Sequence, residues 1–263
     1  MEPLEDWRSP QFEEQLRRLD RGGISFEFLR RNRQYQQDYA AKLAAISDGR
    51  STETEAIGQL TRHWGLRFPA DPSASALTTH PIWQPRHFPA VLTIAAAPDG
   101  FASSFPDPKT LIVHSDAAED GLHAVIDDED GDHRLWFPKH DSAEAAAIRI
   151  PLDGHLLWRV RSALRLWRRL DGEPSGPWPR EQRLSPFQLH RASLMLRAWD
   201  GVAAGVSRRH VAAVLLNKDV EALRALDWKN APERRRLARI LTAARETIED
   251  GYLRWLVPRT RGR

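Results

Sequence analysis

Apolar residues recur at helical spacing near the C-terminal end of the chain. Segment 207–215 begins with Ser207, a favoured helix-capping residue, and its apolar residues share one face: Val211, Ala212, Val214 and Leu215. Segment 230–249 begins Asn230-Ala231-Pro232-Glu233, in which asparagine is a favoured cap, proline suits the first turn, and Glu233 completes the spacing of a capping box. Its apolar face consists of Leu237, Ile240, Leu241, Ala244 and Ile248. The pattern predicts a short helix followed by a long one.

The long predicted helix carries arginines away from its apolar face. At 100° per residue, Arg235 and Arg239 point away from the apolar stripe, and Arg234 and Arg236 flank it. A short capped helix before a longer helix with a basic outer face suits a helix-turn-helix in a DNA major groove. The candidate DNA-binding residues are Ser207, Arg208, Arg209, His210, Lys229, Asn230, Arg234, Arg235, Arg236 and Arg239.

The connection between the two predicted helices is longer than a usual helix-turn-helix turn, which has three or four residues. Residues 216–229 intervene, so the motif would be a variant with an extra short helix at 220–226. The alternative is a helical bundle whose arginines are only solvated. The pattern by itself leaves both interpretations open.

The N-terminal part, residues 7–64, also follows helical periodicity. Ser9-Pro10 begin a first predicted helix that Gly22-Gly23 end, and segments 24–31 and 35–46 form the next two. The aromatic residues of these helices predict a small aromatic core: Trp7, Phe12, Phe26, Phe28, Tyr35 and Tyr39.

Residues 66–150 have a different pattern, in which short β-type runs alternate with Pro, Asp and Ser. The predicted strands are 90–96, 110–114, 122–127, 133–137 and 147–151. The turn chemistry predicts hairpins, one of which has an acidic tip at 128–132. A calcium loop would require carboxylates where Ile126 and Phe137 stand, so the tip is predicted to be a solvated turn.

Residues 153–263 return to helical spacing. Segment 154–170 has an apolar face made of Leu156, Val160, Ala163, Leu164 and Trp167, and it carries Trp158 among arginines on the other face. An exposed tryptophan commonly marks a contact surface, so Trp158, Arg161 and Arg165 are candidate interdomain or oligomer contacts. A Pro/Gly-rich connector follows at 171–184, and Ser185-Pro186 begin a helix that runs to Trp199.

These elements predict an α+β protein that is mainly α. We expect an N-terminal helical domain at 1–65, a small antiparallel β-rich region at 66–152, and a C-terminal helical bundle with the variant helix-turn-helix at 153–263.

The three regions differ strongly in net charge, although the chain as a whole carries only +3. Residues 1–65 carry a net charge of −1 and residues 66–150 carry −7. Residues 151–263 contain 23 Lys and Arg against 12 Asp and Glu, which is a net charge of +11. Such a region attracts polyanions, and arginine contacts phosphates and guanine edges with two hydrogen bonds at once.

The sequence shows few features of enzymes, metal-binding proteins or membrane proteins. The absence of cysteine excludes disulfides, thiolate metal sites and a cysteine nucleophile. No phosphate-binding glycine loop, dinucleotide fingerprint or serine-hydrolase elbow occurs, so we expect no enzyme activity and no cofactor. Four histidines share the acidic region (His114, His123, His133 and His140) without metal-binding spacing, and we expect no metal site. No apolar run would span a membrane and no leader is apparent at the N-terminus, so we expect a cytoplasmic protein.

Two segments resemble the domains of one known family. Residues 6–39 resemble the transcriptional-regulator-like N-terminal domain of proteobacterial proteins, in which a helix ends in Arg-Arg-Asn before an aromatic residue, here Arg30-Arg31-Asn32 and Tyr35. Residues 163–256 resemble the C-terminal domain of the same proteins, a helix-turn-helix variant once described as a domain of unknown function. The matching residues are Trp167, Gly172, Trp199-Asp200-Gly201, Asp227-Trp228-Lys229 and Gly251-Tyr252.

The resemblance implies a transcription regulator of the kind carried on integrative and conjugative elements. Members of the family include activators of excision, conjugation and type VI secretion genes, and shorter relatives are antiactivators that bind an activator protein. The motif helix begins Ser207-Arg208-Arg209 where many relatives have Ser-Tyr-Arg, which favours DNA contact. We therefore expect an activator that binds promoter or operator DNA, forms a homo-oligomer, and contacts RNA polymerase or another regulator. The alternative is an interaction module that binds a transcription factor without contacting DNA.

Overall fold

The computed structural model describes residues 6–50, 52–101, 107–139 and 145–258. The helices before the sheet are α1 (Phe12–Arg17), α2 (Arg21–Leu29), α3 (Arg33–Ser47), α4 (Glu53–Trp64) and α5 (Ala76–Thr79). The sheet region contains β1 (Val91–Ala96), η1 (Pro108–Leu111), β2 (Ile112–Ala118), β3 (Gly121–Ile126), β4 (His133–Pro138) and β5 (Ala146–Arg149). The helices after the sheet are α6 (Leu156–Leu170), α7 (Pro186–Ala203), α8 (Arg208–Leu215), η2 (Lys218–Ala222), α9 (Ala225–Asn230), α10 (Pro232–Glu246), η3 (Thr247–Gly251) and η4 (Tyr252–Trp255).

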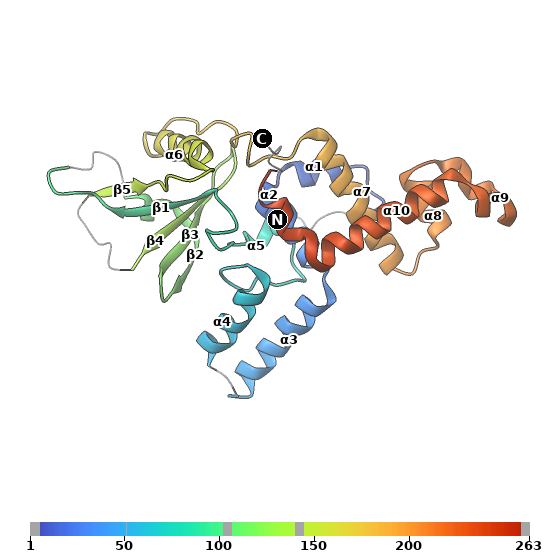
Figure 1. Ribbon diagram of the computed structural model, residues 1–263, viewed down its shortest axis with the longest axis horizontal. Coiled ribbons are helices and arrows are strands. Elements are labelled where there is room, and N and C mark those ends of the chain that lie inside the picture. The colour runs from blue at the N-terminus through green and yellow to red at the C-terminus, as the bar shows by residue number, and fades with distance from the viewer. Residues whose placement is uncertain (1–5, 51, 102–106, 140–144, 259–263) are drawn as a thin grey trace.

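The molecule is elongated (Figure 1). The sheet and α6 lie at one end, an arm containing α8, α9 and α10 lies at the other, and the α3–α4 hairpin projects from the middle. This arrangement confirms the predicted α+β, mainly α class, with helices on both sides of a β-rich region in the sequence.

Helix α2 lies at the centre of the molecule, and all of its residues are buried. Asp20 caps the helix by accepting a hydrogen bond from Gly23 N at 2.9 Å. The prediction that Gly22-Gly23 end the first helix is wrong, because both glycines lie in the first turn of α2. A Cβ atom on Gly22 would lie 3.1 Å from the Phe88 ring, and Trp83 Nε1 donates to Gly22 O at 3.0 Å. Close packing, rather than helix termination, requires glycine here.

One buried core joins the N-terminal helices, the sheet region and the C-terminal helices. It includes Phe12, Phe26, Phe28, Tyr35, Trp83, Val91, Trp158, Met195 and Tyr252. Most of the predicted aromatic cluster belongs to this core, and Tyr39 packs at its edge. Trp7 is the exception, since it is buried against Val211 and Leu237 in a separate core of the C-terminal arm.

The sheet has five strands in the order β2-β3-β4-β1-β5. Strands β3 and β4 form the predicted hairpin, with Ile126 opposite His133. The predicted antiparallel arrangement holds for three of the four strand pairings, but the sheet is mixed, because β1 runs parallel to β4, with Leu92 opposite Leu135. Strand β1 precedes the β2-β3-β4 meander and is joined to it by residues 97–111, so no tight turn dictates its direction. Helix α6 lies against the sheet and contributes Leu166 to its core (Figure 1).

Candidate DNA interface

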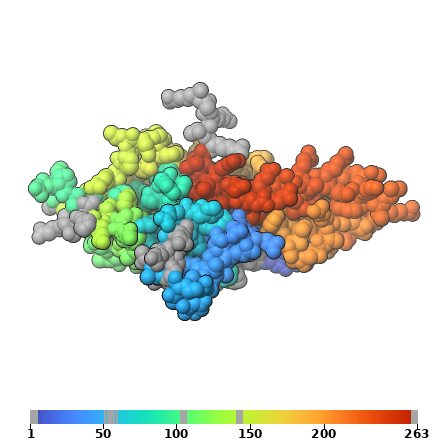
Figure 2. Space-filling view, turned by 60° about the horizontal axis from the view of Figure 1, so that its bottom comes forward, coloured from blue at the N-terminus to red at the C-terminus, as the bar shows by residue number. Residues whose placement is uncertain are grey.

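In the arm, α8 and α10 pack with the end of α7 around a core of their own. Val211 and Leu237 are almost fully buried there. Helix α7 ends near Gly205, whose φ of 77° lies in the left-handed region that favours glycine. Gly201 allows α7 to approach α8 closely, since a Cβ atom would lie 3.0 Å from a methyl group of Val211. Figure 2 shows these helices extending away from the rest of the molecule.

Helix α8 begins as the sequence predicted. Ser207 Oγ accepts a hydrogen bond from His210 N at 3.2 Å, and Arg208 is exposed. The next two candidate residues are engaged within the arm. Arg209 donates to Glu221 O at 2.7 Å, and His210 Nδ1 lies 3.2 Å from the Glu221 carboxylate. Both side chains thus connect η2 to α8. Arg208 is therefore the residue of this group that remains available to contact DNA.

The connector between α8 and α10 contains two short elements, η2 and α9, instead of one extra helix at 220–226. The predicted capping role of Asn230 is wrong, because Asn230 is the last residue of α9 and Ala231 stands at the N-cap of α10. Glu233 accepts from Asn217 Nδ2 at 3.1 Å instead of closing a capping box. Ala231 is buried, and its burial leaves no room for a polar cap. Lys229 and Asn230 remain exposed at the end of α9.

Helix α10 presents a basic surface to solvent. Arg235 and Arg239 are exposed, and neither makes a hydrogen bond or ion pair within the described part of the chain. Leu237 and Ala244 are buried on the opposite side, whereas Ile240 is only partly buried. The two arginines are one helical turn apart, a spacing at which both side chains face the same direction.

The flanking arginines of α10 have local roles. Arg234 Nη1 donates to Lys229 O at 2.8 Å and joins α10 to α9. The hydrogen bond from Asn217 lowers the pKa of the Glu233 carboxyl group, and the charge of Arg236 lowers it further. Helix α10 ends at Glu246, earlier than the predicted 249, because the chain continues as the wider π-helical turn of η3.

Three family models match successive parts of the chain. Residues 6–69 match the proteobacterial transcriptional regulator-like domain, and residues 90–148 match a domain of unknown function. Residues 149–256, which contain the arm, match the model described as T6SS, transcription factor, DNA binding domain. The chain is a DNA-binding transcription regulator. No curated protein matches it.

None of the described helices of the regulator is long and apolar enough to cross a membrane. The domain matches agree with the resemblance inferred from the Arg-Arg-Asn and Trp-Asp-Gly motifs. The structure explains why those two motifs occur together.

The Arg-Arg-Asn motif holds the N-terminal helices of the regulator onto its DNA-binding domain. Arg31 donates two hydrogen bonds of 2.7 Å to the carboxylate of Asp200, in the Trp-Asp-Gly motif of α7, and a third to Glu27. Asn32 Oδ1 caps α3, and its Nδ2 donates to Ile248 O at 2.9 Å in η3. A π-helical turn departs from the hydrogen-bond pattern of an α-helix, and Asn32 satisfies a carbonyl there. Both motifs are apparent in the sequence, but nothing in their spacing along the chain predicts that they contact each other.

Helix α6 of the regulator is turned opposite to its predicted orientation. Trp158 is 2% exposed and packs edge-on against Phe88, and Arg165 is buried. Three residues of the predicted apolar face, Val160, Leu164 and Trp167, are exposed instead, as is Leu157, whereas Leu156 and Ala163 are partly buried. Of the two roles predicted for Trp158, its packing against Phe88 of the preceding region fits an interdomain contact, and its burial leaves no surface for an oligomer contact. Arg161 is exposed and pairs with Glu181.

The acidic tip explains why α6 buries an arginine. Arg165 donates to the main-chain oxygen atoms of Asp130 and Gly131, at 3.2 and 2.8 Å. Ser175 Oγ donates to Asp128 at 2.6 Å, and Gly176 N donates to Asp130 at 2.7 Å. The prediction of a solvated turn holds only in part, because Glu129 and Asp130 are exposed whereas Asp128, Gly131 and Asp132 are partly buried. The tip is clamped between α6 and the connector after it, because its carboxylates offset the charge of the arginines on α6.

Two histidines of the sheet region each lie beside a different aspartate instead of forming one shared site. His133 is buried, with Nε2 at 3.2 Å from Asp128, and His123 Nε2 lies 3.1 Å from Asp120. His140 lies outside the described residues. Among the residues that the structure describes, no group of three or more His, Asp and Glu side chains is arranged to hold a metal ion.

We expect the stability of the regulator to fall between about pH 6.5 and pH 4 because of His133. Burial, together with the nearby charge of Arg165, lowers the pKa of His133 to about 4 despite Asp128. The unfolded chain takes up a proton near pH 6.5 and the folded chain does so only near pH 4, so acidification favours unfolding by up to about 3 kcal/mol. Urea unfolding at several pH values measures this loss.

The variant His133→Gln is the control for this pH dependence. It keeps a polar group at the position but cannot titrate, so its free energy of unfolding should change less over the same pH range. Asp128 and Asp132, whose pKa values are lowered by their hydrogen bonds despite burial, retain their own effect at lower pH in both proteins. Identical pH profiles for the two proteins would contradict the assignment to His133.

Proposed function

We propose that the chain activates genes of a mobile or conjugative element by placing the arm helices in the major groove of promoter DNA. In this arrangement α10 is the recognition helix and α8 contributes Arg208 at the backbone. The observation that carries the proposal is the exposed pair Arg235 and Arg239 on α10, which has no acidic partner within the described residues.

The charge of the chain supports this proposal. Residues 151–263 carry +11, and the described arm adds Lys218, Arg224 and Lys229 to the exposed cations around α10. The partly buried ion pair between Arg31 and Asp200 fixes α7, which the arm packs against, to the N-terminal helices. These helices are then positioned to contact RNA polymerase or another copy of the chain. Homo-oligomer formation and polymerase contact stay predictions.

The salt dependence of DNA binding tests the proposal. If the arm neutralises about five phosphates, a plot of log affinity against log salt concentration should have a slope near −4 to −5 between roughly 50 and 200 mM salt. Mobility shifts on DNA upstream of the gene itself and of neighbouring operons supply the affinities. Binding that is insensitive to salt would instead indicate a protein partner.

A second candidate function is supported by the exposed face of α6. Leu157, Val160, Leu164 and Trp167 lie along one helix face in contact with solvent, a pattern typical of protein-binding surfaces. An interaction module would bind another transcription factor through this face and would not contact DNA. Absence of any DNA shift, together with co-purification of a second regulator, would favour this candidate.

A further inference from the structure

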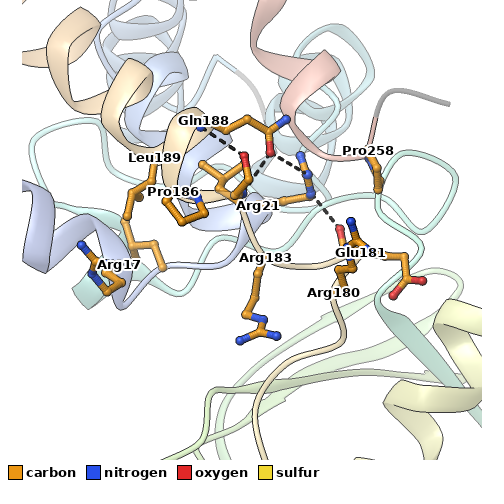
Figure 3. A pocket seen from close by; sticks show the side chains of 12 residues that line it. Arg17, Arg21, Arg180, Glu181, Arg183, Pro186, Gln188, Leu189 and Pro258 are labelled. Carbon is orange, nitrogen blue, oxygen red and sulfur yellow. Dashed lines mark hydrogen bonds between the residues drawn. The ribbon is translucent and has the colours of Figure 1, made fainter. Parts of the chain in front are cut away.

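A pocket of about 900 Å³ lies beside the first turn of α7, between that turn, the end of α1 and the connector 180–184. Figure 3 shows its side chains around the first turn of α7, with Arg17 on one side and Arg180 on the other. Its charged residues are Arg17, Arg21, Arg180, Glu181 and Arg183. The volume matches that of small-molecule sites, and the four arginines favour a multiply charged anion.

The charges of the pocket are largely uncompensated. Arg180 and Arg183 are exposed and have no hydrogen-bond or ion-pair partner among the residues that the structure describes. Glu181 is the acidic member of the lining, and its carboxylate already pairs with Arg161. Arg17 pairs with Glu14 at 3.0 Å on the outer side of α1.

Arg21 is the most informative residue of the pocket, because it is a buried cation without a carboxylate partner. It is 4% exposed, and its guanidinium donates to Glu181 O at 2.7 Å, Trp255 O at 3.2 Å and Gln188 Oε1 at 3.4 Å. All three acceptors are neutral. The neighbouring Asp20 is occupied by Arg134 and by Gln182. Burial lowers the pKa of Arg21, which reflects the cost of keeping this charge from water.

Two neighbouring features, the N-terminus of α7 and the acidic tip, affect how strongly the pocket would attract an anion. The N-terminus of α7, an 18-residue helix, adds positive potential next to Gln188. The acidic tip lines a neighbouring pocket that shares Arg17 and Arg183. Two of its carboxylates, those of Asp128 and Asp130, are already hydrogen-bonded to Ser175 and Gly176.

We propose that this pocket binds a small phosphate-bearing anion of nucleotide size, held by Arg21, Arg180 and Arg183. Helix α7 begins at the pocket and ends against α8 in the arm, so an anion bound at one end of this helix is mechanically connected to the DNA-binding surface. None of the residues that line the pocket belongs to α8, α9 or α10, which separates this ligand from the phosphates that the arm contacts.

Calorimetric titration of the full chain with pyrophosphate and with a nucleoside triphosphate tests the proposal. The wild-type chain should bind at least one probe saturably at a single site. The double variant Arg180→Ala/Arg183→Ala should bind it at least about tenfold more weakly, because two charge-assisted contacts are lost at an exposed position. The matched control Arg235→Ala/Arg239→Ala removes the same charge from the arm and should retain probe binding. Circular dichroism confirms that both variants are folded.

Three outcomes would overturn the proposal. The first is no saturable binding of either probe at millimolar concentration. The second is loss of binding in the arm variant and not in the pocket variant, which would place the anion on the DNA surface. The third is that the wild-type chain binds neither probe and that the pocket variant binds DNA more weakly than the wild type does. The anion that the pocket contacts would then be a DNA phosphate.

Discussion

Replacing Arg235 or Arg239 with alanine should lower affinity for the preferred DNA site by about 1–3 kcal/mol in each case, or roughly 5- to 150-fold. Both side chains are exposed on one face of α10 and lack partners within the described chain, so their removal disturbs no internal contact. Each free energy of binding would come from titration of a labelled promoter fragment. Random DNA measured in parallel separates base reading from phosphate contact.

The control for these two substitutions is Arg62→Ala on α4. Arg62 is exposed and lies on the helical hairpin that projects away from the arm, so its loss removes the same charge without altering the interface. Suppose that all three variants bind DNA as the wild type does and that the α10 variants lose a co-purifying regulator. The protein-interaction function would then replace the one that we propose.

Replacing Arg31 with alanine should destabilise the fold by about 3–5 kcal/mol, because it removes one partner of a buried ion pair. Glu27 is fully buried. Burial by itself would raise its pKa, but Arg31 and Arg30, with the Ala76 N–H group, hold the pKa of Glu27 below its ordinary value. Without Arg31, Glu27 loses one cation and Asp200 loses both of its hydrogen bonds to the guanidinium. Urea unfolding and the melting temperature measure the loss.

Two further variants make this prediction specific. Arg31→Lys keeps the charge but cannot bind Asp200 with two parallel hydrogen bonds, so its loss should be smaller than that of Arg31→Ala. Arg33→Ala removes an exposed arginine at the start of α3 and should change stability by less than about 0.5 kcal/mol. If Arg31→Ala were as stable as Arg33→Ala, the ion pair would not hold the N-terminal helices to the DNA-binding domain.

Short-range sequence patterns alone predicted several elements of the regulator. The β-type runs 122–127 and 133–137 around an Asp- and Gly-containing turn predicted the β3–β4 hairpin. Ser207 predicted the start of α8, and Ser185 predicted the start of α7. The spacing of arginines and apolar residues on α10 predicted which face lies outside. In each case the deciding interactions span four residues or fewer, or a single turn, so the sequence contains them directly.

Tertiary structure decided the features that depend on distant partners. Helix α6 has an apolar face by periodicity, yet it buries Arg165 and Trp158 because the acidic tip and Phe88 lie against that side. Asn230 has the chemistry of a helix cap, but the buried Ala231 takes that position. Asn32 reaches η3 across 216 positions of the chain, a contact that periodicity cannot express. The sequence by itself thus determined the starts of α7 and α8, the hairpin and the basic face of α10. Only the folded chain decided which other faces are buried, because complementary charge and shape from remote segments outweigh the local preference for apolar burial.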